Sequence, residues 1–163
     1  MGLDMYLRGE KFYWNDFKNP KAERKEDGFK VESITLDLGY WRKHPDLHGF
    51  IINSFADGND QCQRIELDAD DLRKIVAAVK ERRLPPTSGF FFGESQNDKQ
   101  QIARDVDILE RALVWLQEGD RDPVSVGIPE PLGAGMAMMK IKPRKQEPVG
   151  QSVTHKVIYQ ASW

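Results

Sequence analysis

The 163-residue sequence has little cysteine, no long apolar run and no large excess of charge of either sign. Its single cysteine, Cys62, cannot form a disulfide within the chain, and no Cys/His cluster accompanies it, so we predict no structural zinc site. No apolar run approaches the roughly 20 residues that a membrane-spanning helix needs. The first residues lack a basic segment followed by an apolar one, so we expect no signal peptide and a cytoplasmic protein.

The balance of charges argues against a polyanionic partner. The 24 basic and 26 acidic residues give a net charge of -2, so no overall field attracts a nucleic-acid backbone. Hydrophobic residues make up 39% of the chain and charged residues 31%, which is typical of a folded domain with a solvated surface. We therefore expect a single domain with no membrane partner and no nucleic-acid partner.

Hydrophobic periodicity predicts an α+β fold, in which three helices pack on a mixed or largely antiparallel sheet of about five strands. Strands are expected at residues 3–7, 29–41, 63–67, 89–93 and 153–163. The first helix is expected to begin at Pro45, because proline is tolerated in the first helical turn. The second is expected after Asp68, a good N-cap, and the third over residues 102–116.

Residues 119–152 differ in composition from the rest of the chain. They contain five of the nine prolines, which predicts a long loop or insertion within the single domain, with a β-hairpin near residues 136–141. A local basic run in this segment is either a partner-binding site or a solvated surface. Its residues are Lys140, Lys142, Arg144 and Lys145. Residues 15–28, which carry charges of both signs, are expected to form an exposed loop.

The stretch from residue 40 to residue 48 is the densest in chemically versatile side chains. It holds two aromatic rings, two cations and two imidazoles where a strand passes into a helix, and it could stack a base and hold a phosphate. The candidate ligand-binding residues are Asp4, Tyr40, Trp41, Arg42 and His48. His44 and His48 are spaced to share a helix face, but a two-histidine spacing is weak support for a metal, and we predict none. Purely structural roles for these side chains remain the competing interpretation.

Alternation along the second strand makes the predictions for this stretch more specific. Tyr40 continues the face of Ile34, Leu36 and Leu38, so it is expected to enter the core, with Trp41 and Lys43 on the opposite side. Arg42 would follow Tyr40 and would need a carboxylate or carbonyl partner, for which Asp4 is the candidate. His48 is expected within one helical turn of that site.

The end of the chain carries aromatic residues that are costly to leave in water. Burying a large aromatic ring is worth a few kcal/mol. We therefore expect Tyr159 and Trp163 to pack on the fold and the last strand to pair inside the sheet. Removal of residues 159–163 should then cause insolubility or a large loss of thermal stability.

Several sequence blocks, in order, resemble a group of small hypothetical proteins of bacteriophages and prophages. The blocks are MGLDMYL, LGYWRKHPDLHGFI, IELDADDLRKIVAAV, PTSGFFFGES and IYQASW, and they cover most of the chain outside residues 9–30 and 119–152. The resemblance matches the family's Tyr-Trp-Arg-Lys, helical His and final Ser-Trp to residues 40–43, His48 and residues 162–163. His44, Pro45 and the 119–152 segment depart from the family pattern. The resemblance implies a viral accessory role without a particular activity.

The leading functional hypothesis is a phage accessory protein that binds a host component and is not an enzyme. The sequence contains no recognisable Ser-His-Asp order, Gly-x-Ser-x-Gly elbow or paired carboxylate motif, and it predicts no cofactor. The host component would be a defence protein or a nucleotide-like ligand. The alternative is a small enzyme acting on a nucleotide or phosphate ester, with His48 as acid/base and Arg42 as anion clamp. A third hypothesis is a structural or assembly factor, which a stable homodimer would favour.

Overall fold

The computed structural model describes residues 2–14, 23–89, 92–119 and 153–163. The α+β class expected from the sequence is confirmed, because the described residues form three helices and an antiparallel four-stranded sheet. In chain order the elements are β1 (Asp4–Tyr13), β2 (Lys25–Glu26), β3 (Phe29–Lys30), β4 (Ser33–Arg42), α1 (Pro45–Phe55), β5 (Ile65–Leu67), α2 (Ala69–Lys80), α3 (Lys99–Gly119) and β6 (Val153–Ser162).

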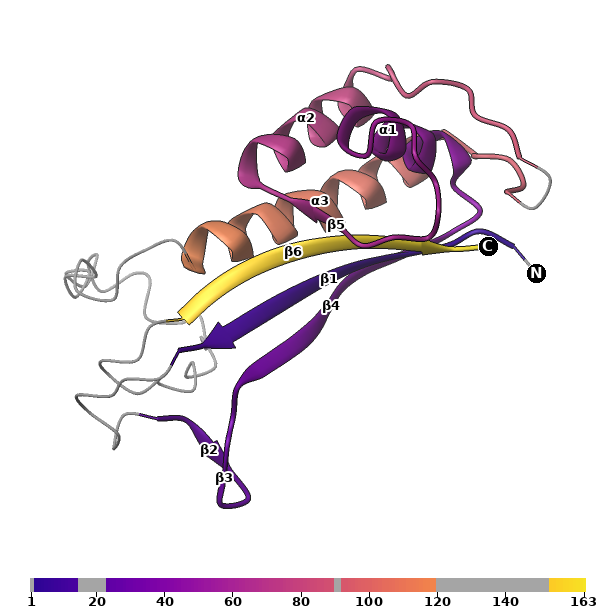
Figure 1. Cartoon of the computed structure of the whole chain (residues 1–163). Coiled ribbons are helices and arrows are strands. Elements are labelled where there is room, and N and C mark those ends of the chain that lie inside the picture. Colours follow the sequence, from indigo (N-terminus) through magenta and orange to yellow (C-terminus); the bar gives the residue numbers. More distant parts are fainter. Residues whose placement is uncertain (1, 15–22, 90–91, 120–152) are drawn as a thin grey trace, which may run out of the picture.

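The main sheet has the strand order β4-β1-β6-β5, and each neighbouring pair is antiparallel. Strand β6 lies between β1 and β5, which confirms that the last strand pairs inside the sheet. The short strands β2 and β3 pair only with each other. Figure 1 shows α1, α2 and α3 on one side of the main sheet, which we call the helix side, and the opposite side is called the open face.

The helices begin where the sequence provides N-terminal signals. Pro45 opens α1, as expected. Asp68 caps α2 through a capping box: its side chain accepts from the backbone N–H of Asp71 (2.8 Å), and the Asp71 carboxylate accepts from the backbone N–H of Asp68 (3.2 Å). These caps satisfy N–H groups that have no partner within the helix.

The core lies between the helix side of the sheet and the three helices. Alternate residues of β1 and β6 point into it, and the intervening residues point to the open face. The fully buried members include Leu3, Met5, Leu7, Val157 and Tyr159, all at 0–1% exposure. Leu72 and Ile75 of α2 and Leu109 of α3 complete the core from the helix layer.

A β-bulge in β4 decides which of its residues face the core. Leu7 of β1 pairs with Gly39, whereas the next residue, Arg8, pairs with Asp37, so Leu38 has no partner in the register. The extra residue reverses the alternation of side chains along the strand. Gly39 and Trp41 consequently lie opposite Leu7 and Met5, on the helix side.

The prediction that Tyr40 enters the core is therefore wrong, and so is the placement of Trp41 on the opposite side. Tyr40 is 37% exposed on the open face, and Trp41 is 2% exposed on the helix side. The prediction assumed unbroken alternation from Ile34 to Tyr40, and the bulge at Leu38 breaks it. Gly39 also lets α3 approach β4, because a Cβ at this position would lie 2.3 Å from Cγ2 of Ile108.

Two other expected elements also differ. The strand expected at residues 89–93 is not formed by its described members: Gly89, Phe92 and Gly93 lie outside any strand, and the Phe92 N–H donates to the Gly89 carbonyl (3.1 Å). The strand expected over residues 29–41 is divided between the β2–β3 hairpin and β4. The hairpin expected near residues 136–141 lies outside the described residues.

Candidate functional site

The sheet separates the five candidate ligand-binding residues into two groups. Asp4, Tyr40 and Arg42 lie on the open face, whereas Trp41 and His48 lie on the helix side. The expected proximity of His48 to Arg42 is wrong, because His48 is a buried residue of α1 on the helix side (1% exposed), whereas Arg42 projects from the other side of the sheet. The basic run at Lys140, Lys142, Arg144 and Lys145 lies outside the described residues.

The open face carries an aromatic pair flanked by arginines. The Tyr6 and Tyr40 rings have centroids 5.4 Å apart, and the Arg8 guanidinium lies over the Tyr6 ring, 4.9 Å from its centroid. The Tyr40 hydroxyl donates to Oδ1 of Asp4, and Nε of Arg42 lies 3.9 Å from the same oxygen. The expected pairing of Arg42 with Asp4 is therefore present, although Arg42 is largely exposed rather than buried.

The carboxylate of Asp4 also changes the acidity of its tyrosine neighbour. The hydrogen bond to Asp4 raises the pKa of the Tyr40 hydroxyl above its usual value, with burial and the Asp4 charge adding to the effect. Arg42 opposes this change, because its positive charge favours the phenolate. Tyr40 is therefore a neutral hydrogen-bonding group at physiological pH.

Two further ion pairs lie on the open face. Arg64 pairs with Glu10, and Lys156 pairs with Glu66 at 3.0 Å. Carboxylates thus offset Arg42, Arg64 and Lys156, so these three described cations do not form the unbalanced positive surface that holds a phosphate backbone.

On the helix side, His48 forms one closed polar cluster with residues from three other segments. Its Nδ1 lies 2.7 Å from the Tyr159 hydroxyl, and its Nε2 lies 2.9 Å from Oδ2 of Asp60. The Phe92 ring packs edge-on to the imidazole, with centroids 5.3 Å apart. Trp163 donates from Nε1 to Oδ1 of Asp60 (3.2 Å) and is 43% exposed. Both nitrogens of His48 have partners, so the imidazole has no free position for a substrate.

The burial of Tyr159 in this cluster is complete, as expected from the sequence. Burial raises the pKa of the Tyr159 hydroxyl well above its usual value, and the charge of Asp60 adds to the effect. Trp163 contacts the fold through Asp60 and Phe92, so the end of the chain is held by two interactions that converge on the His48 cluster.

A second polar cluster on the helix side is the His44 network, which joins the buried Trp41, His44 and Asp105 to the partly buried Ser95 and Gln101. Asp105 is 1% exposed and receives three hydrogen bonds. The donors are Nε1 of Trp41 (2.8 Å), Nε2 of Gln101 (2.6 Å) and Nε2 of His44 (2.8 Å). On its other side, Nδ1 of His44 lies 2.9 Å from Oγ of Ser95. A carboxylate, an imidazole and a hydroxyl are therefore connected by two consecutive hydrogen bonds.

The spacing of apolar residues in the sequence of α3 indicates that Asp105 is buried. Asp105 occupies the same stripe of α3 as Leu109, Ala112 and Leu116, all of which are buried. A carboxylate on an apolar stripe must find partners inside the fold, because burying an unpaired charge is very costly. Its partner His44 is 61 residues away in the chain, so the pairing itself has no local signal.

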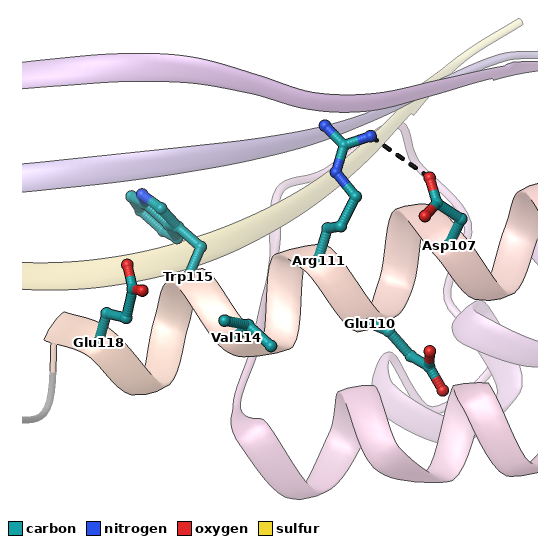
Figure 2. A pocket seen from close by; sticks show the side chains of 6 residues that line it. All are labelled: Asp107, Glu110, Arg111, Val114, Trp115 and Glu118. Carbon is teal, nitrogen blue, oxygen red and sulfur yellow. Dashed lines mark hydrogen bonds and ion pairs between the residues drawn. The ribbon is translucent and has the colours of Figure 1, made fainter. Parts of the chain in front are cut away.

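A shallow groove of about 410 Å³ runs along the solvent side of α3. Figure 2 shows that the six residues lining it all belong to this helix, with Trp115 directed towards the strands and Glu110 away from them. Arg111 and Asp107 form an ion pair within this set (3.3 Å), and Glu110 pairs with Lys80 of α2 (2.5 Å). The groove contains none of the residues of the open face, the His48 cluster or the His44 network.

No protein-family model, curated protein or solved structure matches the chain. Across the described residues, no three His, Cys, Asp or Glu side chains gather in a way that could hold a metal ion. No helix in the same part of the structure is sufficiently long and apolar to cross a membrane.

Proposed function

We propose that this protein is a phage accessory protein that works by binding a host protein in the cytoplasm of an infected bacterium. The resemblance of the sequence blocks to phage and prophage proteins supports the viral origin. The observation that carries the binding proposal is the aromatic–arginine surface of Tyr6, Arg8, Tyr40 and Arg42 on the open face. Figure 1 draws the three helices on the other side of the sheet, so none of them covers this surface.

The residue types on this surface favour a protein as partner. Tyrosine and arginine are enriched among the residues that dominate protein–protein binding energies, because they combine large contact area with directional hydrogen bonds. Here they project from paired strands, so little conformational entropy is lost when a partner binds. The intervening carboxylates of Asp4 and Glu10 favour a partner surface that itself carries both signs of charge.

The proposal can be tested by placing a photo-crosslinking amino acid at Tyr6 in the full-length protein, expressed in bacteria. The matched control carries the same amino acid at Arg73, an exposed position on α2. Figure 1 shows that helix on the side of the sheet opposite the open face. We expect a defined host-protein adduct from position 6 that is absent from position 73. The adduct should be lost when Arg42→Glu or Tyr40→Ala is added, and retained with Arg73→Glu.

The small-ligand and assembly-factor hypotheses predict different results from the same crosslinking samples. Co-purification of a nucleotide-like molecule that depends on Arg42, without a protein adduct, would replace the host protein with a small ligand. A stable homodimer that crosslinks to itself through position 6 would favour an assembly factor. If adducts form equally from both positions, or survive Arg42→Glu, the open face is not the binding surface.

A further inference from the structure

We propose that Ser95, His44 and Asp105 form a nucleophilic relay that makes the Ser95 hydroxyl reactive towards carboxylic esters. This inference rests on the His44 network and is independent of the open face. It assigns Ser95 as the nucleophile and His44 as the general base, with Asp105 as a positioning residue.

The hydrogen-bond directions in the network place each proton where the relay requires it. The Asp105 carboxylate can only accept, so Nε2 of His44 carries a hydrogen and donates to Oδ2 (2.8 Å). In the neutral imidazole, Nδ1 then has a lone pair and accepts from the Ser95 hydroxyl (2.9 Å). A base oriented by a carboxylate on one nitrogen, with a hydroxyl on the other, is the arrangement that activates serine nucleophiles.

The Asp105 carboxylate is held rigidly enough to orient His44. Trp41 and Gln101 both donate to Oδ1, which leaves Oδ2 directed at the imidazole. Both Asp105 and His44 are nearly fully buried, at 1% and 2% exposure. In so little water, the interaction of the carboxylate with an imidazolium is stronger than it would be at the surface.

The Ser95 hydroxyl lies at the edge of this buried network rather than inside it. Ser95 is partly exposed and is flanked by the exposed residues Glu94 and Gln96. Its oxygen also accepts from the backbone N–H of Asp46 (3.0 Å), which stabilises negative charge as the proton leaves. The Asp46 carboxylate is engaged by the Thr87 N–H (2.9 Å) and Nδ2 of Asn97 (2.6 Å), and these donors reduce its repulsion of an anion.

The chemical step balances without any further reactant except water. Oγ of Ser95 attacks the ester carbonyl carbon, its proton passes to Nδ1 of His44, and Asp105 stabilises the resulting imidazolium. The C–O bond to the leaving alcohol breaks, and the alkoxide takes the proton from His44. Water then attacks the acyl-serine with His44 again accepting a proton, and Ser95 leaves with that proton while the carboxylic acid is released.

The test uses a fluorophosphonate probe and p-nitrophenyl acetate on the full-length protein. The probe should add to Ser95 with loss of fluoride, as read by peptide mass spectrometry, and ester hydrolysis should show an initial burst. Ser95→Ala should abolish both signals. Ser88→Ala, which removes an exposed hydroxyl from the same segment, should leave them unchanged. Absence of an adduct on Ser95 of the folded protein would overturn the proposal.

Asp105→Asn tests the relay rather than the nucleophile alone. The Asn amide would turn its NH2 group towards His44 and force the hydrogen onto Nδ1, so the Ser95 proton loses its acceptor. We expect labelling to slow by on the order of 10³-fold, with a changed pH profile. A labelling rate and pH profile equal to those of the unaltered protein would show that Asp105 does not position His44.

If Asp105→Asn does not fold, Ser95→Cys in a Cys62→Ser background tests directly whether His44 activates the side chain at position 95. An imidazole at 2.9 Å lowers the pKa of a thiol, so alkylation by iodoacetamide at pH 7 should be at least 10-fold faster than for Ser88→Cys in that background. Equal alkylation rates would overturn the proposal.

Discussion

Strand β4 contributes to two polar regions that lie on opposite sides of the sheet and differ in almost every physical respect. On the open face, Tyr40 and Arg42 are exposed, and Arg42 interacts with Asp4 at a separation of 3.9 Å. On the helix side, Trp41 is buried, and its indole N–H donates to Asp105 within a fully hydrogen-bonded network. Adjacent residues of one strand thus belong to an exposed aromatic–arginine surface and to a buried network.

The difference shows which polar groups are enclosed within this fold and which are exposed on its surface. Within the described residues, no buried side-chain polar atom lacks a hydrogen-bond partner. Buried groups are costly to leave unpaired, so each change in the His44 network should affect folding. Exposed pairs are weak because water and salt screen them, so the open face can change with little effect on stability.

The largest expected effect comes from breaking the His44 network. Asp105→Ala leaves the buried donors of Trp41, Gln101 and His44 without an acceptor, which should cost about 3–5 kcal/mol of unfolding free energy. Asp107→Ala is the matched control, because Asp107 is exposed on the same helix and pairs with Arg111. Its cost should stay below about 1 kcal/mol. Urea unfolding measures both, and equal costs would contradict the contrast between the two regions.

A somewhat smaller effect is expected where α3 approaches β4 closely. Gly39→Ala places a Cβ 2.3 Å from Cγ2 of Ile108, which is too close for two carbon atoms, so the helix must shift at a cost of about 1–3 kcal/mol. Thr35→Val on the open side of the same strand should change the unfolding free energy by less than about 0.5 kcal/mol. If Gly39→Ala were as well tolerated as Thr35→Val, the close packing of α3 on β4 would be wrong.

The third prediction uses pH to distinguish the buried tyrosine from the exposed one. Tyr159→Phe leaves Nδ1 of buried His48 without its partner, which should cost about 1–2 kcal/mol near pH 7. Because burial raises the pKa of Tyr159 above 10.0, the unfolded chain loses this proton first as the pH rises. The stability that the hydroxyl provides is therefore complete below pH 10 and declines above it.

Urea midpoints at pH 7, 9 and 10.5 measure this effect. The difference in urea midpoint between the unaltered protein and Tyr159→Phe should be constant up to pH 9 and smaller at pH 10.5. Tyr40→Phe is the control on the open face, where the hydroxyl is exposed and its effect on stability should be small at every pH. A difference in urea midpoint for Tyr159→Phe that increases with pH would contradict the burial of the Tyr159 hydroxyl.

Local sequence patterns were sufficient to predict most helices and strands, but not the contacts between them or the side of the sheet that each strand residue faces. Pro45, the Asp68 cap and the apolar stripe of α3 are encoded within a few residues. Helices α1 and α2 begin at those signals, whereas α3 begins at Lys99, before the expected start of its stripe at residue 102. The side to which Tyr40 points depends on a single unpaired residue, Leu38, and only the adjacent Gly39 hinted at an irregularity in the strand.

The polar clusters depend on contacts between distant parts of the chain. His44 meets Asp105 across 61 residues, and His48 meets Tyr159 across 111. No spacing rule connects such pairs before the topology is known. The sequence therefore identified the stretch from residue 40 to residue 48 as dense in functional groups, whereas the division of that stretch between two sides of the sheet required the structure.

The smallest expected effect on stability concerns Arg42 and Lys43, neighbouring cations in that stretch. Arg42 is 64% exposed, so its pairing with Asp4 contributes about 0.2–1 kcal/mol, which is what Arg42→Ala should cost. Lys43 adopts a φ of 54°, which is unfavourable for a residue with a side chain. Lys43→Ala keeps this strain and should be nearly silent in urea unfolding, whereas Lys43→Gly should stabilise the protein by about 1 kcal/mol.

Host-protein crosslinking from position 6 should respond differently to the two residues. Arg42→Ala should reduce crosslinking, because it removes a charge that faces the proposed partner. Lys43→Gly should leave crosslinking unchanged, because it alters the backbone beyond the end of β4. A large stability loss for Arg42→Ala, with host-protein crosslinking from position 6 retained, would make Arg42 a structural residue and would remove the contrast between the two sides of the strand.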